Sequence, residues 1–107
     1  MKICVSAMSG SMDAKVSERF GRAPYFVIVE SGDMSFVPVL NAAESMQGGA
    51  GPEAVRQAAE KGAEVVLTGE LGPNAKTALA AAGITGVTGL KADKTVRQAV
   101  EDYLKSR

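Results

Sequence analysis

The sequence contains no histidine and no tryptophan, and Cys4 is its one cysteine. Without histidine, the chain lacks the side chain that serves most often as a general base and as a metal ligand. One cysteine excludes an internal disulfide, and it falls short of the four thiolates that usually hold an iron–sulfur cluster. A nuclease-type site would need several carboxylates on central strands, and the first predicted strand offers none. We therefore expect a protein that binds something rather than an enzyme.

Net charge and long apolar runs are also missing. Twelve lysine and arginine residues balance twelve aspartate and glutamate residues, so no overall field attracts nucleic acid or an anionic membrane. No apolar run approaches the roughly 20 residues that a membrane-spanning helix requires. The first residues enter a strand pattern directly, without the apolar stretch of a signal peptide. We expect a cytoplasmic protein with no nucleic-acid or membrane partner, either a monomer or a weak dimer.

What is present is typical of one globular domain spanning residues 1–107. Of the 107 residues, 46% are hydrophobic and 22% are charged, as in ordinary folded proteins. Apolar and β-branched runs predict five strands, at residues 3–5, 25–29, 34–40, 64–67 and 84–87. Helical spacing of alanine and other apolar residues predicts three helices, one from Pro52 to Gly62, one from Pro73 to Gly83, and one that starts with a Thr95–Gln98 capping box.

The order of these elements is β-β-β-α-β-α-β-α. The short turn at Ser31-Gly32-Asp33 makes a hairpin of the second and third strands. Strand–helix–strand units are parallel and right-handed, so only the second strand should run against the others. This pattern predicts an α/β protein with a three-layer ribonuclease H-like fold, in which helices cover both faces of a mixed five-stranded sheet.

The topology also predicts where a ligand would bind. Open α/β sheets bind ligands beyond the carboxyl ends of their parallel strands, and both long loops, residues 9–22 and 41–51, should lie at that edge. Glycines before the first two helices leave backbone N–H groups free, and Arg19 and Arg22 add positive charge, which favours an anion. Glycine before a helix is also ordinary turn chemistry, so both interpretations stay open.

The predicted site residues come from these loops and from one helix start. The expected lining is Met8, Ser9, Ser11, Arg19, Phe20, Gly21, Arg22, Gln47, Gly48, Gly49 and Asn74. Phe20 has a second interpretation as a core residue that anchors its loop. Cys4 is the one candidate metal ligand, although a cysteine on a central strand is more often an inert buried side chain. Glu64 and Glu70 flank the fourth strand and are expected to be solvated surface charges.

Several segments, in order along the chain, resemble one known family. They are Met1-Lys2-Ile3 before the first strand, Phe20-Gly21-Arg22-Ala23-Pro24-Tyr25-Phe26, Gly48-Gly49-Ala50-Gly51, Gly72-Pro73-Asn74-Ala75, and Thr95-Val96. Over nearly its whole length the chain resembles the dinitrogenase iron–molybdenum cofactor biosynthesis family, which comprises small nitrogenase accessory domains. The resemblance implies a ribonuclease H-like fold and a role in binding or carrying iron–sulfur precursors of the nitrogenase cofactor. A protein that donates or accepts such a cluster would then be a partner.

Two departures from the family pattern bear on metal binding. Family members commonly carry a histidine just before Phe-Gly-Arg, where this chain has Arg19, and another near Gln47 or Gly48. Arginine stays protonated and cannot coordinate a metal, although it can pair with an anionic cluster. Direct ligation would then fall to Cys4 or to a partner chain. The leading hypothesis is a non-enzymatic binding or carrier domain for an anionic cofactor, such as an iron–sulfur or iron–molybdenum cofactor precursor. The alternative is a protein–protein interaction or regulatory module with no metal ligand of its own.

Overall fold

The computed structural model describes residues 1–107 and has the α/β architecture that the sequence predicts. Its strands are β1 Lys2–Ala7, β2 Tyr25–Glu30, β3 Phe36–Leu40, β4 Val65–Leu67 and β5 Thr85–Val87; its helices are α1 Ala50–Glu60, α2 Pro73–Ala82 and α3 Val96–Lys105, with a short 3₁₀ turn, η1, at Phe20–Arg22. The order of strands and helices along the chain is the predicted one. None of the helices is both long and apolar enough to cross a membrane.

The strands form one mixed sheet in the order β3-β2-β1-β4-β5. β2 pairs antiparallel with both β1 and β3, while β1, β4 and β5 pair in parallel. As predicted, β2 alone runs against the others. The edge strand β3 carries Pro38 opposite Val27. The bonds Glu30 N–H to Ser35 O and Asn41 N–H to Pro24 O place Pro38 at a position that faces the free edge. Its missing N–H therefore breaks no bond to β2 and makes the edge a poorer template for pairing.

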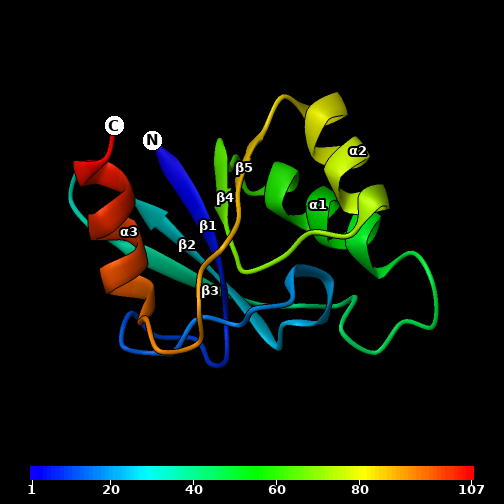
Figure 1. The fold of residues 1–107 in the computed structure, drawn as a ribbon, viewed down its shortest axis with the longest axis horizontal. Coiled ribbons are helices and arrows are strands. Elements are labelled where there is room, and N and C mark those ends of the chain that lie inside the picture. The colour runs from blue at the N-terminus through cyan, green and yellow to red at the C-terminus, as the bar shows by residue number, and fades with distance from the viewer.

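The helices cover opposite faces of the sheet: α3 lies on one side, and α1 and α2 lie together on the other (Figure 1). Because side chains alternate along a strand, Ile3 and Val5 of β1 pack toward α3 while Cys4 between them packs toward α1 and α2. The α3 side has an aliphatic core that includes Val96 and Val100. The other side combines Phe20 and Phe26 with the small alanines of α1 and α2. The result is a three-layer arrangement.

Residues 9–22 differ from the expected loop, because the first half of the segment is part of the core. Met12, Ala14 and Val16 are buried on the α3 side of the sheet, and Val16 forms a bridge with Ala7 at the end of β1. The chain then crosses the edge of the sheet, and Phe20 is buried on the opposite side. The buried residues alternate with exposed ones in this segment, and that strand-like period was hidden among its serines and glycines.

Three element starts test the local predictions. α3 begins as predicted: the Thr95 side chain accepts a hydrogen bond from the Gln98 N–H, and the Gln98 side chain accepts one from the Thr95 N–H. α1 begins at Ala50, two residues before Pro52, and its N-cap Gly49 adopts the left-handed conformation (φ 74°), which glycine tolerates without strain. β3 begins at Phe36 rather than at Met34, because Met34 lies in the turn with φ 59°.

Candidate functional site

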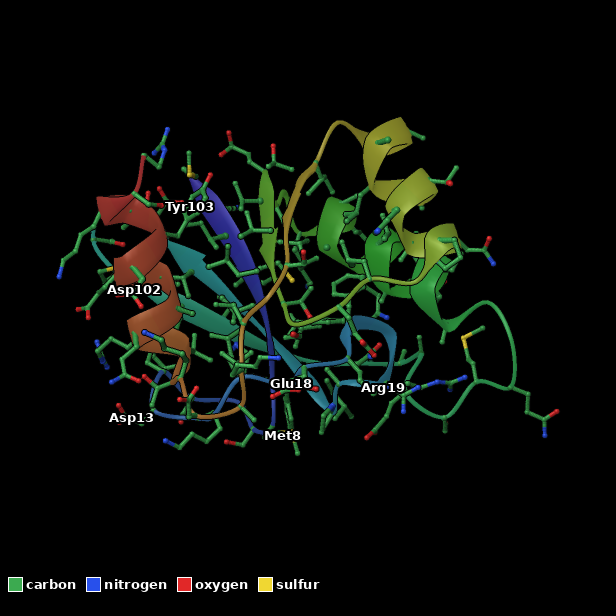
Figure 2. The ribbon with its side chains drawn as sticks, viewed as in Figure 1. Met8, Asp13, Glu18, Arg19, Asp102 and Tyr103 are labelled. Carbon is green, nitrogen blue, oxygen red and sulfur yellow. The ribbon has the colours of Figure 1, made fainter.

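The site lies at the edge of the sheet where β1, β3, β4 and β5 end. A cavity of about 470 Å³ opens there between η1, the first turns of α1 and α2, and the segment that follows β4. Figure 2 shows Arg19 and Glu18 at this edge, with Met8 just beyond the end of β1. The lining residues are Arg19, Phe20, Gly21, Arg22, Gly49, Ala50, Gly51, Pro52, Glu70, Leu71, Gly72, Pro73, Asn74 and Ala75. The sheet edge predicted from topology is therefore the edge that carries the cavity.

The amino-terminal ends of α1 and α2 both line this cavity, and neither has a side-chain cap. The backbone N–H groups of Ala50 and Gly51 in α1, and of Asn74 and Ala75 in α2, have no acceptor within the protein. Unpaired N–H groups at a helix start carry partial positive charge and favour anions. Two such helix starts at one cavity give it an attraction for negative charge that needs no charged side chain.

The two predicted arginines line the cavity, and both already have partners. The Arg19 Nε lies 3.9 Å from a carboxylate oxygen of Glu70, and both side chains are more than two-thirds exposed (71% and 73%). The Arg22 guanidinium donates hydrogen bonds to the backbone carbonyls of Glu44 and Met46. Arg22 therefore fastens the loop before α1, while Arg19 pairs only loosely and can turn to a ligand.

A second, shallower hollow of about 560 Å³ adjoins the cavity. The two hollows share Arg19 and Arg22, and the second is lined further by Met8, Val16, Ser17, Glu18, Pro24, Glu44 and Ala92. Met8 is 55% exposed, and Glu18 accepts a hydrogen bond from the Ala92 N–H. The two arginines thus form the boundary between an anion-favouring cavity and a mixed acidic and apolar surface.

The structure brings together about half of the residues that the sequence indicated. Arg19, Phe20, Gly21, Arg22, Gly49 and Asn74 line the cavity, and Met8 lines the neighbouring hollow. Ser9, Ser11, Gln47 and Gly48 are on the same loops but line neither space. For Phe20 the core interpretation is confirmed: the residue is 2% exposed and its ring centroid lies 5.1 Å from that of Phe26.

Cys4 does not line the cavity, and it lies in the core beneath α1 and α2. It is fully buried, and burial raises the pKa of its thiol from 9.0 to about 12. Metals bind the thiolate form, so a metal ligand here would require both deprotonation and opening of the core. No group of three or more histidine, cysteine, aspartate or glutamate side chains could hold a metal ion. Direct coordination by this chain thus has no support in the geometry.

The predicted lining left out much of the cavity wall that α1, α2 and the end of β4 supply, although the glycines before both helices were expected to favour an anion. These residues are Ala50, Gly51, Pro52, Glu70, Leu71, Gly72, Pro73 and Ala75. The signal for them was present: a glycine and a proline mark each helix start, and both helices follow strand-like segments. Glu70 was assigned to the solvated surface, and its side chain is indeed well exposed, yet it also contributes a carboxylate to the wall.

Comparisons with known proteins agree with the fold and with the family resemblance. The family model described as dinitrogenase iron–molybdenum cofactor matches residues 1–106. The structure is similar to the apo form of the orange protein from Desulfovibrio gigas, with a TM-score of 0.94 and 42% identity over 98% of this chain and 88% of that one. It is also similar to the NMR structure of a NifB-like protein from Thermotoga, assigned to the DUF35 family, with a TM-score of 0.84 and 27% identity over 99% of this chain and 89% of that one. None of the curated proteins matches the sequence.

Proposed function

The chain belongs to the dinitrogenase iron–molybdenum cofactor family, and from that premise we propose that it is a non-enzymatic binding or carrier domain for an anionic metal–sulfur cofactor or its precursor. One observation carries the proposal: two helix starts without side-chain caps line the same cavity, and their first N–H groups have no acceptor within the protein. The similar structure of the orange protein is that of its apo form.

The donor set of the cavity limits what the cargo can be. The lining offers backbone N–H groups, the Asn74 amide, the Arg19 and Arg22 guanidinium groups and one carboxylate, that of Glu70, and it offers no thiolate and no imidazole. The N–H and guanidinium groups hold an anion by hydrogen bonds and charge, and the lining brings together no group of three metal-ligating side chains. The residues therefore fit a cluster that arrives with its own sulfide or oxide ligands. They do not fit one that must be built on protein side chains.

The same proposal includes a partner protein. A carrier needs a protein that donates or accepts its cargo, and the hollow beside the cavity, with exposed Met8 at its rim, offers contact area for one.

We also assign the ribonuclease H-like fold to this chain. The mixed sheet, in which β2 alone is reversed, and the helices on both faces support that assignment.

Binding of a coloured metal–sulfur anion tests the proposal directly. The probe is tetrathiomolybdate, added without oxygen to ¹⁵N-labelled protein, and reconstitution with iron and sulfide is run in parallel. We expect saturable binding, with the largest amide shifts at Ala50, Gly51, Asn74 and Ala75. The Cys4→Ala variant should bind as tightly as the wild type, because the thiol is fully buried and does not line the cavity.

Three results would contradict the proposal. Amide shifts centred elsewhere, for example on the lysines at 91 and 94, would place the anion outside the cavity. If neither tetrathiomolybdate nor iron and sulfide binds, the hypothesis of an interaction module is favoured. Loss of binding in Cys4→Ala alone would show that the core opens and that the thiol is a ligand.

A further inference from the structure

We infer that Asn41 is the positioning residue of the cavity, a side chain that never contacts the cargo and yet sets how well the cavity holds it. This inference rests on the proposed function. Asn41 follows the last residue of β3 and is 4% exposed, and it is absent from the cavity lining. No local sequence pattern marks it as part of a site. Its importance comes from the elements that its amide joins.

The Asn41 side chain uses both ends of its amide. Its Nδ2 donates to the carbonyl oxygens of Gly21 and Ala23, at 3.2 and 2.9 Å. Its Oδ1 accepts from the Ala43 N–H at 2.9 Å and from the Gln57 Nε2 at 3.0 Å. One buried side chain therefore ties the η1 turn to the loop after β3 and to α1. Since no buried side-chain polar atom lacks a partner, the network is fully satisfied and specifies a single arrangement.

The carbonyl of Gly21 matters because Gly21 begins a close-packed row across the cavity wall. A Cβ added to Gly21 would lie 3.1 Å from the Gly51 nitrogen, and one added to Gly51 would lie 3.1 Å from the Cβ of Ala75. These spacings show that η1 rests on the start of α1 and that α1 rests on the start of α2. By holding Gly21, Asn41 fixes the distance between the η1 turn and both sets of free N–H groups.

The other side of the η1 segment is held by backbone contacts. The Glu70 N–H donates to the Glu18 carbonyl at 2.7 Å, and the Phe20 N–H donates to the Glu70 carbonyl at 3.4 Å. Gly69 allows this approach, since a Cβ there would lie 2.5 Å from the Glu18 oxygen. The segment is thus clamped between the end of β4 and the Asn41 amide. Loss of Asn41 frees one side of the clamp, and the turn that carries Arg19 can then move.

The test compares Asn41→Asp with Val100→Ala. The aspartate keeps the shape and the acceptor oxygen, but it replaces the two donated hydrogen bonds by repulsion from the Gly21 and Ala23 carbonyls. Val100 is fully buried on the α3 side of the sheet, far from the cavity wall, so its truncation lowers stability without touching the clamp. Both variants are studied at a temperature where urea titrations show them to be folded.

We expect Asn41→Asp to weaken tetrathiomolybdate binding at least about tenfold, since each lost buried hydrogen bond changes an equilibrium by roughly that factor. Val100→Ala should bind within about twofold of the wild type. In the free protein, hydrogen exchange of the Phe20 and Ala23 amides should accelerate in Asn41→Asp and stay unchanged in Val100→Ala. Gln57→Met keeps Asn41 and removes the side chain that orients it, so this variant replaces Asn41→Asp if the latter does not fold. Its affinity for tetrathiomolybdate should be about threefold lower than that of the wild type.

Equal affinity of Asn41→Asp and the wild type would overturn the inference, as would equal losses in Asn41→Asp and Val100→Ala. If the wild type binds neither tetrathiomolybdate nor iron and sulfide, the proposed function fails, and the exchange rates in the free protein still decide the role of Asn41. Unchanged exchange at Phe20 and Ala23 would then show that the amide does not hold the turn.

Discussion

The two faces of the sheet differ most at the starts of their helices. On one face, α3 begins with a complete capping box between Thr95 and Gln98. The Val96 and Arg97 N–H groups donate to the carbonyls of Ala14 and Met12, so the first N–H groups of α3 are satisfied by the protein. On the other face, the N-caps of α1 and α2 are Gly49 and Gly72, and neither helix has a side-chain cap. A side-chain cap at either position would stabilise its helix by only a few tenths of a kcal/mol relative to glycine. The proposed function accounts for the absence of both caps, since each would occupy N–H donors that line the cavity.

The two cores differ in the same sense. The α3 face packs valines such as Val96 and Val100 against the sheet, while the face of α1 and α2 uses alanines such as Ala54, Ala58 and Ala75. Small side chains bring the helices close together, so that their starts can share one cavity. The face of the sheet covered by α1 and α2, called the open face below, is anchored by a few large residues, chiefly Phe20 and Phe26. This division predicts which substitutions change stability and which change binding.

Phe20→Ala should have the largest effect, because it removes the anchor of the open face. The side chain is 2% exposed and packs on Phe26, so we expect a loss of about 3–5 kcal/mol in the free energy of unfolding. Phe36→Ala is the matched control: Phe36 is 42% exposed on the edge strand, and its truncation should lose less than about 1 kcal/mol. Urea denaturation measures both. Similar losses would mean that η1 is not anchored through Phe20.

Cys4 tests whether the core beneath the cavity is closed. Burial raises the pKa of its thiol from 9.0 to about 12, so between these pH values the unfolded chain releases a proton that the folded chain keeps. Stability contributed by the neutral thiol is complete below pH 9 and falls above it, by up to about 1.4 kcal/mol per pH unit. Wild type and Cys4→Ala, denatured with urea from pH 8 to pH 10.5 under reducing conditions, should therefore converge or cross. Parallel pH profiles would show that the thiol is reached by solvent.

Gly72→Asp, on the open face, should lower the affinity for tetrathiomolybdate and slightly raise the stability of the protein. The N-cap backbone of α2 is extended (φ −69°, ψ 165°), and an added Cβ meets nothing within 4 Å, so the aspartate can cap Asn74 or Ala75. The helix should gain a few tenths of a kcal/mol. Tetrathiomolybdate affinity should fall about tenfold or more, because the N–H donors are taken and a negative charge is added.

Gly72→Asn separates occupied donors from added charge, since it offers the same cap without the charge; its affinity should fall between those of wild type and Gly72→Asp. Thr95→Ala, on the face covered by α3, removes an existing cap instead of adding one. It should lose about 1 kcal/mol of stability and leave tetrathiomolybdate binding unchanged. If Gly72→Asp binds the probe like the wild type, the α2 start is not part of the binding site.

Most of the fold could be predicted because its signals are local. The capping residues of α3, the glycine that ends α2 and the apolar run of β4 each mark an element within a few residues, and all of them agree with the structure. The alternation of Met12, Ala14 and Val16 was the exception. Its buried partners belong to α3 and the sheet, and serine, glycine and charged neighbours hid the period.

The site was predictable only in outline. The sheet edge followed from topology, and Arg19, Gly21 and Asn74 followed from loop position. The Asn41 network did not, since Gln57 is separated from it by 16 positions and no short-range rule couples an asparagine after a strand to a helix interior. The role of Arg22 was also unpredictable, because its partners are backbone carbonyls of Glu44 and Met46, which any sequence would offer.

Glu70→Gln should have the smallest effect on affinity. It tests whether side-chain charge, in addition to the backbone N–H groups of the open face, influences anion binding. Glu70 is the one carboxylate in the cavity lining, and its 3.9 Å pair with Arg19 is well exposed. We expect tetrathiomolybdate to bind about threefold more tightly at low salt, with stability unchanged within about 0.5 kcal/mol.

The double-variant cycle with Arg19→Ala makes this last prediction sharper. While Glu70 is present it competes with the cargo for the guanidinium, so Arg19→Ala should weaken binding only slightly; in the Glu70→Gln background the same change should weaken it more. The difference should shrink as salt is added, because exposed charges are screened. Additive effects at all salt concentrations would mean that Arg19 does not reach the bound anion. Recognition would then rest on the N–H groups of α1 and α2 alone, and the contrast between capped and uncapped helices would account for binding without any charged side chain.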